Sequence, residues 1–241
     1  MDELEHFWKP IPPYDDRGWD LVPPIEECGE PLVDITGRTP RILYGASYLR
    51  QGLDGALDRC WVREGVWERL RRVLALLPER YSLLIFDGLR PLRVQRAIYG
   101  QFKTVIQEER PGISAAELEL ILEDYVARPV KRLDRPAPHT TGGAVDLTLC
   151  LDGTPMDMGT GFDNLTSQAH TDWFERTDGG RETVRDQRRL LFHVMEAAGF
   201  VNYGCEWWHY SYGDRQWARQ KKGVPIYGSV SYTHLTLPTI Y

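Results

Sequence analysis

The sequence predicts an α+β fold in which helices pack on a mostly antiparallel sheet. Segments with apolar residues at helical spacing and short strand-like segments are mixed along the chain at unequal intervals. They lack the regular strand–helix alternation of a doubly wound parallel sheet, and no internal repeat is visible. With 42% apolar and 27% charged residues, the 241-residue chain has the composition of a globular protein with a packed core.

The two ends of the chain differ from its middle. Residues 1–40 are rich in proline and acidic residues, which suits an arm on the domain surface better than helices or central strands. We expect one domain over residues 41–228. Residues 229–241 contain no Lys, Arg, Asp or Glu, so we interpret them as a tail: a frayed end, a strand, or sequence foreign to the natural protein.

Four helices follow from local patterns. Apolar residues at helical spacing predict helices over residues 64–77 and 184–198. Pro91 suits the first turn of a third helix, because its fixed φ and missing N–H are tolerated there. Ser114 and Glu117 form a capping box, which predicts the start of a fourth helix.

The strand signals are shorter. Residues 81–86 form a continuous apolar run that is typical of a buried strand. Residues 144–149 alternate, so Asp146 is expected to point away from the apolar layer. A long loop rich in Gly, Asp and Thr is predicted over 151–180, and an aromatic strand over 200–212.

Charge and patterning exclude some functions. The net charge is −6, and 29 basic residues are mixed among 35 acidic ones, so no nucleic-acid partner is expected. No apolar run is long enough for a membrane span, and the first thirty residues lack a signal-peptide pattern. We expect a cytoplasmic protein, or a periplasmic one if a leader has been removed. The four cysteines form no CxxC pair and are expected to be reduced thiols.

His139 and Asp146 are the first candidates for a metal site. They lie at either end of H-T-T-G-G-A-V-D, whose glycines permit a loop imidazole and a strand carboxylate to approach closely. A carboxylate among Val and Leu also needs a partner, because an unpaired buried charge is costly. The alternative is a histidine that caps a turn and an aspartate that is bonded to backbone amides.

Glu206 and His209 occur together in C-E-W-W-H-Y. On a regular strand they would face opposite ways, so a shared site requires a bulge or twist between them. Trp207 and Trp208 suit core packing. Taken alone, this glutamate and histidine are more often structural than functional.

Together the candidates form a stronger set. His139, Asp146 and His209 are suitable ligands for one Zn2+ per chain, and three protein ligands leave the fourth tetrahedral position for water. Glu206 would then be free to take a proton from that water. This combination indicates hydrolysis.

Arg90 is a candidate for stabilising negative charge in the reaction. It follows a predicted strand end in D-G-L-R-P. An arginine fixed at that position supplies positive charge where a carbonyl oxygen becomes an oxyanion. The alternatives are an arginine paired with Asp87 and one that lies on the surface.

Four segments carry a family resemblance: D-G-L-R-P, H-T-T-G-G-A-V-D-L-T-L, M-G-T-G-F-D and E-W-W-H-Y. In this order, over about residues 42–217, they resemble the zinc D-alanyl-D-alanine dipeptidases associated with vancomycin resistance and peptidoglycan turnover. The resemblance implies the α+β fold shared with zinc D,D-carboxypeptidases and the Hedgehog amino-terminal domain. It also implies His139, Asp146 and His209 as zinc ligands, Glu206 as catalytic base and Arg90 as stabiliser of the tetrahedral intermediate.

By the same resemblance, Asp163 in G-F-D and Tyr44 in R-I-L-Y would hold the free amino group of the substrate. An anion and a phenolic oxygen can bind an ammonium group and so select a dipeptide over an internal peptide bond. The alternatives are an aspartate that caps the loop and a tyrosine that packs in the core.

The sequence departs from the family just before the first zinc histidine. Family members carry serines there, whose hydroxyls are thought to help bind the substrate carboxylate, whereas this chain has Ala137 and Pro138. Proline has neither a hydroxyl nor an amide hydrogen. The departure leaves zinc hydrolysis intact but bears on the preference for D-Ala-D-Ala. Cys205, beside the proposed base, is expected to pack, with zinc ligation as the alternative.

The expected function is zinc-dependent hydrolysis of D-alanyl-D-alanine or a related short dipeptide, in peptidoglycan metabolism or glycopeptide resistance. The nearest alternative is a zinc D,D-carboxypeptidase or cell-wall endopeptidase with the same centre and longer substrates. An alternative of another class is a non-enzymatic, zinc-stabilised binding domain. Glu206 and Arg90 argue against that class, because neither is needed merely to hold a metal.

Overall fold

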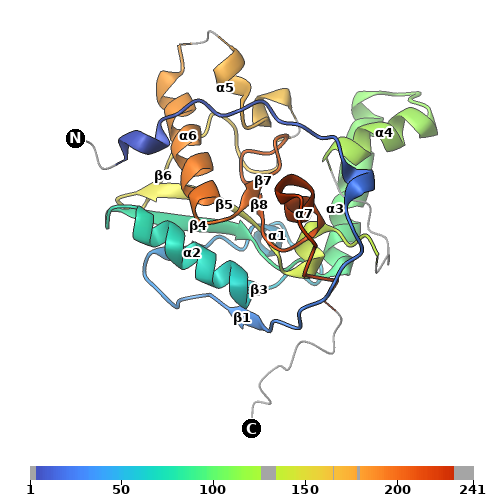
Figure 1. Cartoon of the computed structure of the whole chain (residues 1–241). Coiled ribbons are helices and arrows are strands. Elements are labelled where there is room, and N and C mark those ends of the chain that lie inside the picture. The colour runs from blue at the N-terminus through green and yellow to red at the C-terminus, as the bar shows by residue number, and fades with distance from the viewer. Residues whose placement is uncertain (1–3, 126–133, 165, 178–179, 231–241) are drawn as a thin grey trace.

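A computed structural model describes residues 4–125, 134–164, 166–177 and 180–230, and confirms the α+β architecture (Figure 1). The main sheet has the strand order β2-β4-β5-β8-β7, with β6 paired to β5 outside this path. β2 is parallel to β4, and the other described pairs are antiparallel. Its strands are β2 (Ile42–Tyr44), β4 (Tyr81–Asp87), β5 (Ala144–Leu151), β6 (Thr154–Pro155), β7 (Val201–Asn202) and β8 (His209–Ser211).

A small two-stranded sheet and several helices complete the described part of the chain. The small sheet pairs β1 (Leu32–Asp34) with β3 (Trp61–Arg63). The α-helices are α1 (Ser47–Arg50), α2 (Glu64–Leu76), α3 (Leu92–Glu109), α4 (Ala115–Tyr125), α5 (Trp173–Arg176), α6 (Glu182–Ala197) and α7 (Arg215–Lys221). The short 3-10 helices are η1 (Glu5–Phe7), η2 (Trp19–Leu21), η3 (Pro138–Thr141) and η4 (Ser167–Ala169).

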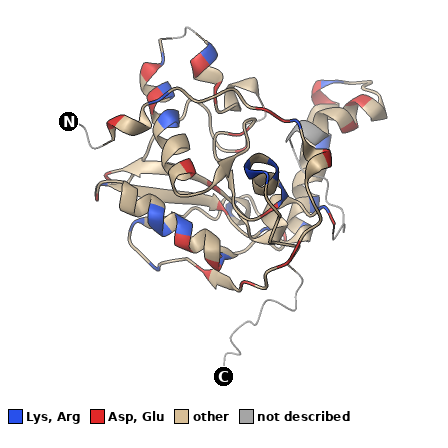
Figure 2. Ribbon diagram, viewed as in Figure 1, with Lys and Arg blue, Asp and Glu red and all other residues tan. Residues whose placement is uncertain are grey.

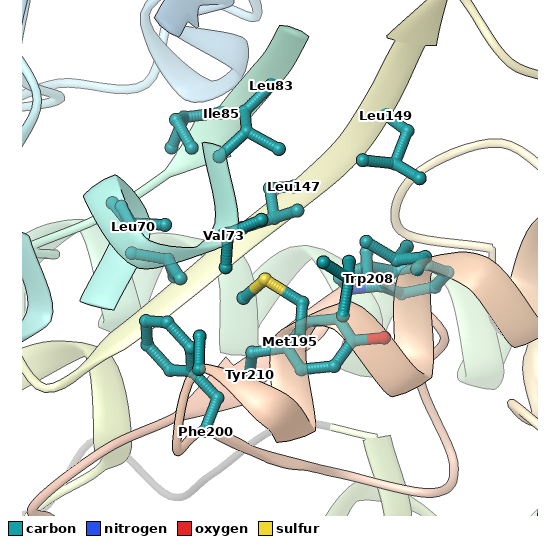
Figure 3. Close-up of a cluster of buried hydrophobic side chains, with 14 of the residues drawn as sticks. Leu70, Val73, Leu83, Ile85, Leu147, Leu149, Met195, Phe200, Trp208 and Tyr210 are labelled. Atoms are coloured by element: carbon teal, nitrogen blue, oxygen red, sulfur yellow. The ribbon is translucent and has the colours of Figure 1, made fainter. Parts of the chain in front are cut away.

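The main hydrophobic core lies between the sheet and helices α2 and α6 (Figures 1 and 3). The apolar stripes of these two helices, predicted from their spacing, supply part of this core. Val145, Leu147 and Leu149 of β5 join it, whereas Asp146 does not. The predicted alternation of β5 is therefore confirmed, and Asp146 is left on the other side of the strand.

Two smaller apolar clusters involve α3. One joins α1 to α3 through Tyr48 and Val94, and the other joins α3 to α4. The predicted capping box begins α4 as expected, because the Ser114 hydroxyl donates to a carboxylate oxygen of Glu117 at 2.7 Å and accepts from the Glu117 amide at 3.2 Å. These contacts fix the helices that flank the site.

The predicted aromatic strand over 200–212 is wrong. The segment forms β7 and β8, joined by a tight turn in which the Glu206 amide donates to the carbonyl of Tyr203 at 2.8 Å. Gly204 permits this turn, because a Cβ there would lie 2.1 Å from the ring of Tyr14. The predicted loop over 151–180 also contains β6, η4 and α5.

The N-terminal segment runs across the surface of the domain (Figure 1). It is bonded to α5 through Ile11 and Glu175, and to α7 through the carbonyl of Asp15, which accepts from Arg219 at 2.7 Å. At the other end, the Val230 amide donates to Thr140 at 2.8 Å. Residues 231–241 of the predicted tail lie outside the described residues.

The surface carries both signs of charge. Figure 2 shows Lys and Arg interspersed with Asp and Glu over the helices. All four cysteines are free thiols, as expected. Within the described ranges, none of the helices combines the length and apolar character needed to cross a membrane.

Arg188 anchors the long segment between β5 and α6. Its side chain is 1% exposed, and its guanidinium donates to three carbonyl oxygens of that segment. The acceptors are Met158 at 2.7 Å, His170 at 2.6 Å and Gln168 at 2.9 Å. One buried side chain therefore fixes the segment that carries Asp163.

We expect Arg188→Met to lower the free energy of unfolding by about 2–4 kcal/mol, because these carbonyl oxygens lose their donors while remaining buried. Urea denaturation followed by circular dichroism measures the change. The matched control is Arg185→Met on the same helix, whose partner is the partly exposed Asp186; it should change stability by less than about 0.5 kcal/mol. Equal effects in the two variants would contradict the anchoring role of Arg188.

Candidate metal centre and active site

Strand pairing places Asp146 and His209 at one point of the sheet. Asp146 lies directly opposite His209 in the β5–β8 register and opposite Asp87 in the β4–β5 register. Residues that are directly opposite in an antiparallel pair project from the same face. The three side chains therefore form a row across β4, β5 and β8.

His139 reaches the same point from η3, just before β5. Its Nδ1 lies 2.8 Å from the carbonyl oxygen of Gly88. Because a carbonyl oxygen only accepts, Nδ1 carries the proton and Nε2 keeps a lone pair. Gly142 has a φ of 72°, and a Cβ at Gly143 would lie 2.7 Å from the carbonyl oxygen of Tyr212. Both predicted glycines are thus required for the turn into β5.

The three side chains present one ligand atom each to a common point. Nε2 of His139 lies 3.1 Å from Nδ1 of His209 and 3.2 Å from Oδ1 of Asp146, and the remaining pair is 3.1 Å apart. Ligands bound to zinc at about 2.0–2.1 Å in a tetrahedron lie about 3.3 Å from one another. The three buried atoms therefore have the spacing of one face of such a tetrahedron, and the donor set fits zinc.

Neighbouring groups orient these ligand atoms. Nε2 of His209 lies 3.3 Å from the hydroxyl of Ser211, which leaves Nδ1 directed to the common point. Oδ2 of Asp146 accepts from Arg90 at 3.3 Å, which leaves Oδ1 directed there. Burial opposes ionisation of Asp146, but His139 and His209 outweigh it and hold the pKa of this carboxyl below its usual value. The carboxylate form, which binds metal, is favoured.

Glu206 lies beside the centre without belonging to it. The turn between β7 and β8 places its Oε2 3.7 Å from Nδ1 of His209, whereas a continuous strand would have turned the two residues apart. The predicted bulge or twist is thus a complete chain reversal. Burial, together with the carboxylates of Asp146 and Asp163, raises the pKa of Glu206 well above its usual value.

Arg90 is buried, and its guanidinium donates to four neighbouring groups. Its Nε donates to Asp87 at 2.7 Å and its Nη1 to Gln95 at 2.9 Å. Its Nη2 donates to the Tyr48 hydroxyl at 3.1 Å and to Asp146 at 3.3 Å. Pairing with Asp87, one of the sequence alternatives, is therefore present, and the surface alternative is wrong. The guanidinium places a positive charge next to the ligand Asp146.

A cavity of about 190 Å³ opens onto these groups. His139, Asp146, His209, Glu206 and Arg90 all line it, so the structure brings the five predicted residues together at one concave site. Apolar side chains complete part of the wall, including Ile98 and Phe102 of α3 and Trp208. The arrangement resembles an enzyme site, in which a few polar groups converge in a mainly apolar pocket.

Asp163 lies in the same cavity, as predicted, but Tyr44 does not line it. Tyr44 is in register with Ile85, a residue of the main core, and its hydroxyl donates to the carbonyl of Leu57 at 3.2 Å. The tyrosine beside Asp163 is Tyr48 on α1, whose hydroxyl donates to Asp163 at 3.3 Å. The packing alternative therefore describes Tyr44, and Tyr48 occupies the position expected for it.

Asp163 is partly buried. Burial raises its pKa to about 7, with Arg90 opposing the rise and Asp146 adding to it. It also adopts a positive φ of 59°, which is uncommon for a residue other than glycine. A buried acid held in this conformation next to a cavity is a candidate for binding a cationic group.

Sequence reasoning missed several further residues that line the cavity, among them Tyr48, Gln95, Trp19 and Gln216. Trp19 comes from η2 in the N-terminal segment, and Gln216 from the first turn of α7. Of these residues, only Tyr48 could have been found from the sequence, because it is a second tyrosine four residues after the predicted Tyr44. Cys205 is not part of the three-residue metal cluster and lies near Tyr203 and Tyr14 instead.

Comparisons with known proteins agree with this geometry. A family model described as D-ala-D-ala dipeptidase matches residues 49–226. A D-alanyl-D-alanine dipeptidase of Synechocystis is 32% identical over 235 residues, which cover 89% of this chain and 92% of that protein. One of Enterococcus faecium is 31% identical over 61% of this chain and 69% of its own length.

One solved structure is a mutant of the vancomycin-resistance D,D-pentapeptidase VanY in complex with Zn(II). It is similar with a TM-score of 0.43 and 17% identity, and covers 69% of this chain and 83% of its own. The matched range, residues 49–226, spans the positions of Arg90, His139, Asp146, Glu206 and His209. On the extent of that match and of the Synechocystis relative, the chain belongs to the D-ala-D-ala dipeptidase family.

Proposed function

We propose that this protein is a zinc-dependent dipeptidase that hydrolyses D-alanyl-D-alanine or a related short dipeptide, in peptidoglycan metabolism or glycopeptide resistance. The observation that carries the proposal is the buried triangle of His139, Asp146 and His209, with Glu206 uncoordinated beside it. Family membership supports the choice of substrate. A bound Zn2+ would supply a Lewis acid that polarises the peptide carbonyl and lowers the pKa of water.

Glu206 acts as general base and then as general acid. Its carboxylate takes a proton from the attacking water as the water oxygen bonds to the carbonyl carbon. The carbon–nitrogen bond of the peptide then breaks, and Glu206 returns the proton to the leaving amine. The 3.7 Å separation between its Oε2 and Nδ1 of His209 keeps the carboxylate close to the reacting atoms.

Arg90 stabilises the negative charge that develops on the carbonyl oxygen. Its guanidinium lines the cavity and is held in place by Asp87, Gln95 and Tyr48, so no reorganisation is needed during the reaction. Fixed positive charge in a buried site is worth more than the same charge in water. The buried setting of Arg90 therefore supports this role.

Asp163 selects the free amino end of a dipeptide. It is the acid in the cavity that is bonded to Tyr48 rather than to the metal cluster. The cavity of about 190 Å³ is smaller than the roughly 300–1,000 Å³ of sites for drug-sized ligands, which favours a short substrate. A longer peptide would have to place its chain where Asp163 lies.

We expect Glu206→Gln to retain one zinc per chain while its kcat for D-Ala-D-Ala falls by about 100- to 10,000-fold, because the amide cannot accept the proton. Elemental analysis measures the zinc, and a coupled assay for released D-alanine measures the rate. His209→Ala is the matched comparison and should lose both metal and activity. Substantial turnover by Glu206→Gln would assign the base to another residue.

Arg90→Ala should lower kcat by about 100- to 1,000-fold with zinc retained, because one donor to the oxyanion is removed. Arg90→Lys keeps the positive charge but lacks the planar set of guanidinium donors, so its kcat should fall by less than that of Arg90→Ala. Arg93→Ala on α3 is the control, because this exposed arginine does not line the cavity. Near-normal kcat in Arg90→Ala, with wild-type metal content, would remove Arg90 from the mechanism.

Asp163→Asn should raise the KM for D-Ala-D-Ala by about 10- to 100-fold, because the ammonium group loses a charged partner. The wild-type protein should leave N-acetyl-D-Ala-D-Ala intact for the same reason. Asp157→Asn in the same segment is exposed and should behave like wild type. Cleavage of the acetylated peptide at the rate of the free one would indicate a carboxypeptidase or endopeptidase instead.

A further inference from the structure

Gln216 is a buried residue of the cavity wall whose side-chain Nε2 has no hydrogen-bond partner among the described residues. It lies in the first turn of α7, is 4% exposed and lines the same cavity as the metal cluster. Its Nε2 finds no acceptor among the described residues. Buried amide groups are almost always bonded, because leaving a donor unpaired costs free energy. Of the buried side-chain atoms that lack a partner among the described residues, this is the one whose residue lines the cavity.

The other glutamines near this site show the usual behaviour. Gln220, one turn further along α7, donates to the carbonyl oxygen of Asn202 at 2.7 Å. Gln95, which lines the cavity, accepts from Arg90 at 2.9 Å. All three glutamines lie in helices. Gln216 differs from the other two because its Nε2 has no acceptor among the described residues.

The helices that carry Gln216 and Tyr48, the partner of Asp163, pack on strands that lie on either side of the two strands with the metal cluster. Asp163 is bonded to Tyr48 of α1, and α1 packs against β4. Gln216 belongs to α7, which packs against β7 at the far edge of the sheet. The ligands Asp146 and His209 lie on β5 and β8, between those two strands. The cavity therefore has an acidic end, a metal centre and an amide-donor end.

A dipeptide has the complementary order of groups: an ammonium, a scissile carbonyl and a carboxylate. The carboxylate needs donors at the end away from Asp163. Four of the five N–H donors of Arg90 are bonded to Asp87, Gln95, Tyr48 and Asp146, and the fifth is assigned above to the oxyanion. Ala137 and Pro138, which also line the cavity, have no side-chain donor.

We propose that Nε2 of Gln216 donates to the terminal carboxylate of the substrate and so makes Gln216 a specificity residue. The assignment rests on the proposed dipeptidase function and adds to it the group that recognises the second end of the dipeptide. Asp214 fixes the start of α7, which carries Gln216, because its side chain accepts from the Trp217 amide at 2.9 Å.

The test compares D-Ala-D-Ala with its C-terminal amide, using zinc-loaded wild type, Gln216→Met and Gln216→Glu. Gln216→Met should raise the KM of the free acid by about 10- to 100-fold with little change in kcat, because a hydrogen bond to a charged group is lost. Gln216→Glu should shift the ratio of kcat/KM for acid over amide by at least about tenfold toward the amide, because like charges repel and the amide can donate.

Thermal unfolding separates this role from a structural one. Gln216→Met removes an unpaired buried donor, so its Tm should equal or exceed that of wild type. Gln220→Met is the matched control: it loses a bond within the protein, so its Tm should fall while its acid-to-amide ratio stays unchanged.

Two outcomes would overturn the assignment of Gln216, and a third would overturn the proposed function as well. An unchanged acid-to-amide ratio in Gln216→Glu refutes it, as does a lower Tm in Gln216→Met accompanied by equal loss for both peptides. In either case the dipeptidase function stands, provided that the wild-type protein cleaves D-Ala-D-Ala. A zinc-loaded wild-type protein that cleaves neither peptide overturns the proposed function, and the role of Gln216 with it.

Discussion

The register between β5 and β8 is the constraint on which the site depends. It sets Asp146 directly opposite His209, and a slip of one residue would turn Asp146 into the main core and away from its partner. His139 is fixed independently, through its Nδ1 on the Gly88 carbonyl and its own carbonyl, which accepts from the Arg90 amide at 3.1 Å. The ligand atoms are thus arranged by the backbone, and metal binding requires little further ordering.

This arrangement concentrates negative charge. Asp87, Asp146, Asp163 and Glu206 surround a single buried guanidinium, that of Arg90. Arg90 bridges Asp87 and Asp146 directly and reaches Asp163 through the Tyr48 hydroxyl. Asp87 and Asp146 are buried, and Asp163 and Glu206 are partly buried. One cation does not balance this group of acids, so a divalent ion at the cluster would supply positive charge. Metal binding and folding stability are therefore expected to be linked.

The features that depend on local sequence patterns could be predicted from the sequence alone. The helices α2, α3, α4 and α6, the alternation of β5 and the glycines before it follow from periodicity and turn chemistry. The cluster of His139, Asp146 and His209 could be predicted because zinc restricts which residue types bind it. The remaining features depend on tertiary contacts: Tyr14 packs on Gly204 where β7 turns toward β8, and register puts Tyr44 in the core. No local sequence pattern identifies Gln216. The proposal for this residue depends on the missing hydrogen-bond partner of its Nε2, which only the structure shows.

The residues proposed to bind the metal lie on the sheet, and those proposed to bind the ends of the substrate lie outside it. This arrangement explains how one metal centre can act on substrates of a particular length. The catalytic groups Asp146 and His209 lie on paired strands, whereas Asp163 and Gln216 lie on a long connecting segment and a short helix. Each of these is anchored separately, the segment by Arg188 and the helix by Asp214. Changes in either peripheral element can alter which ends of a peptide are recognised while the register of the sheet is preserved. In the proposed function, selection for a dipeptide therefore depends on the two anchored ends of the cavity, and hydrolysis depends on the sheet between them.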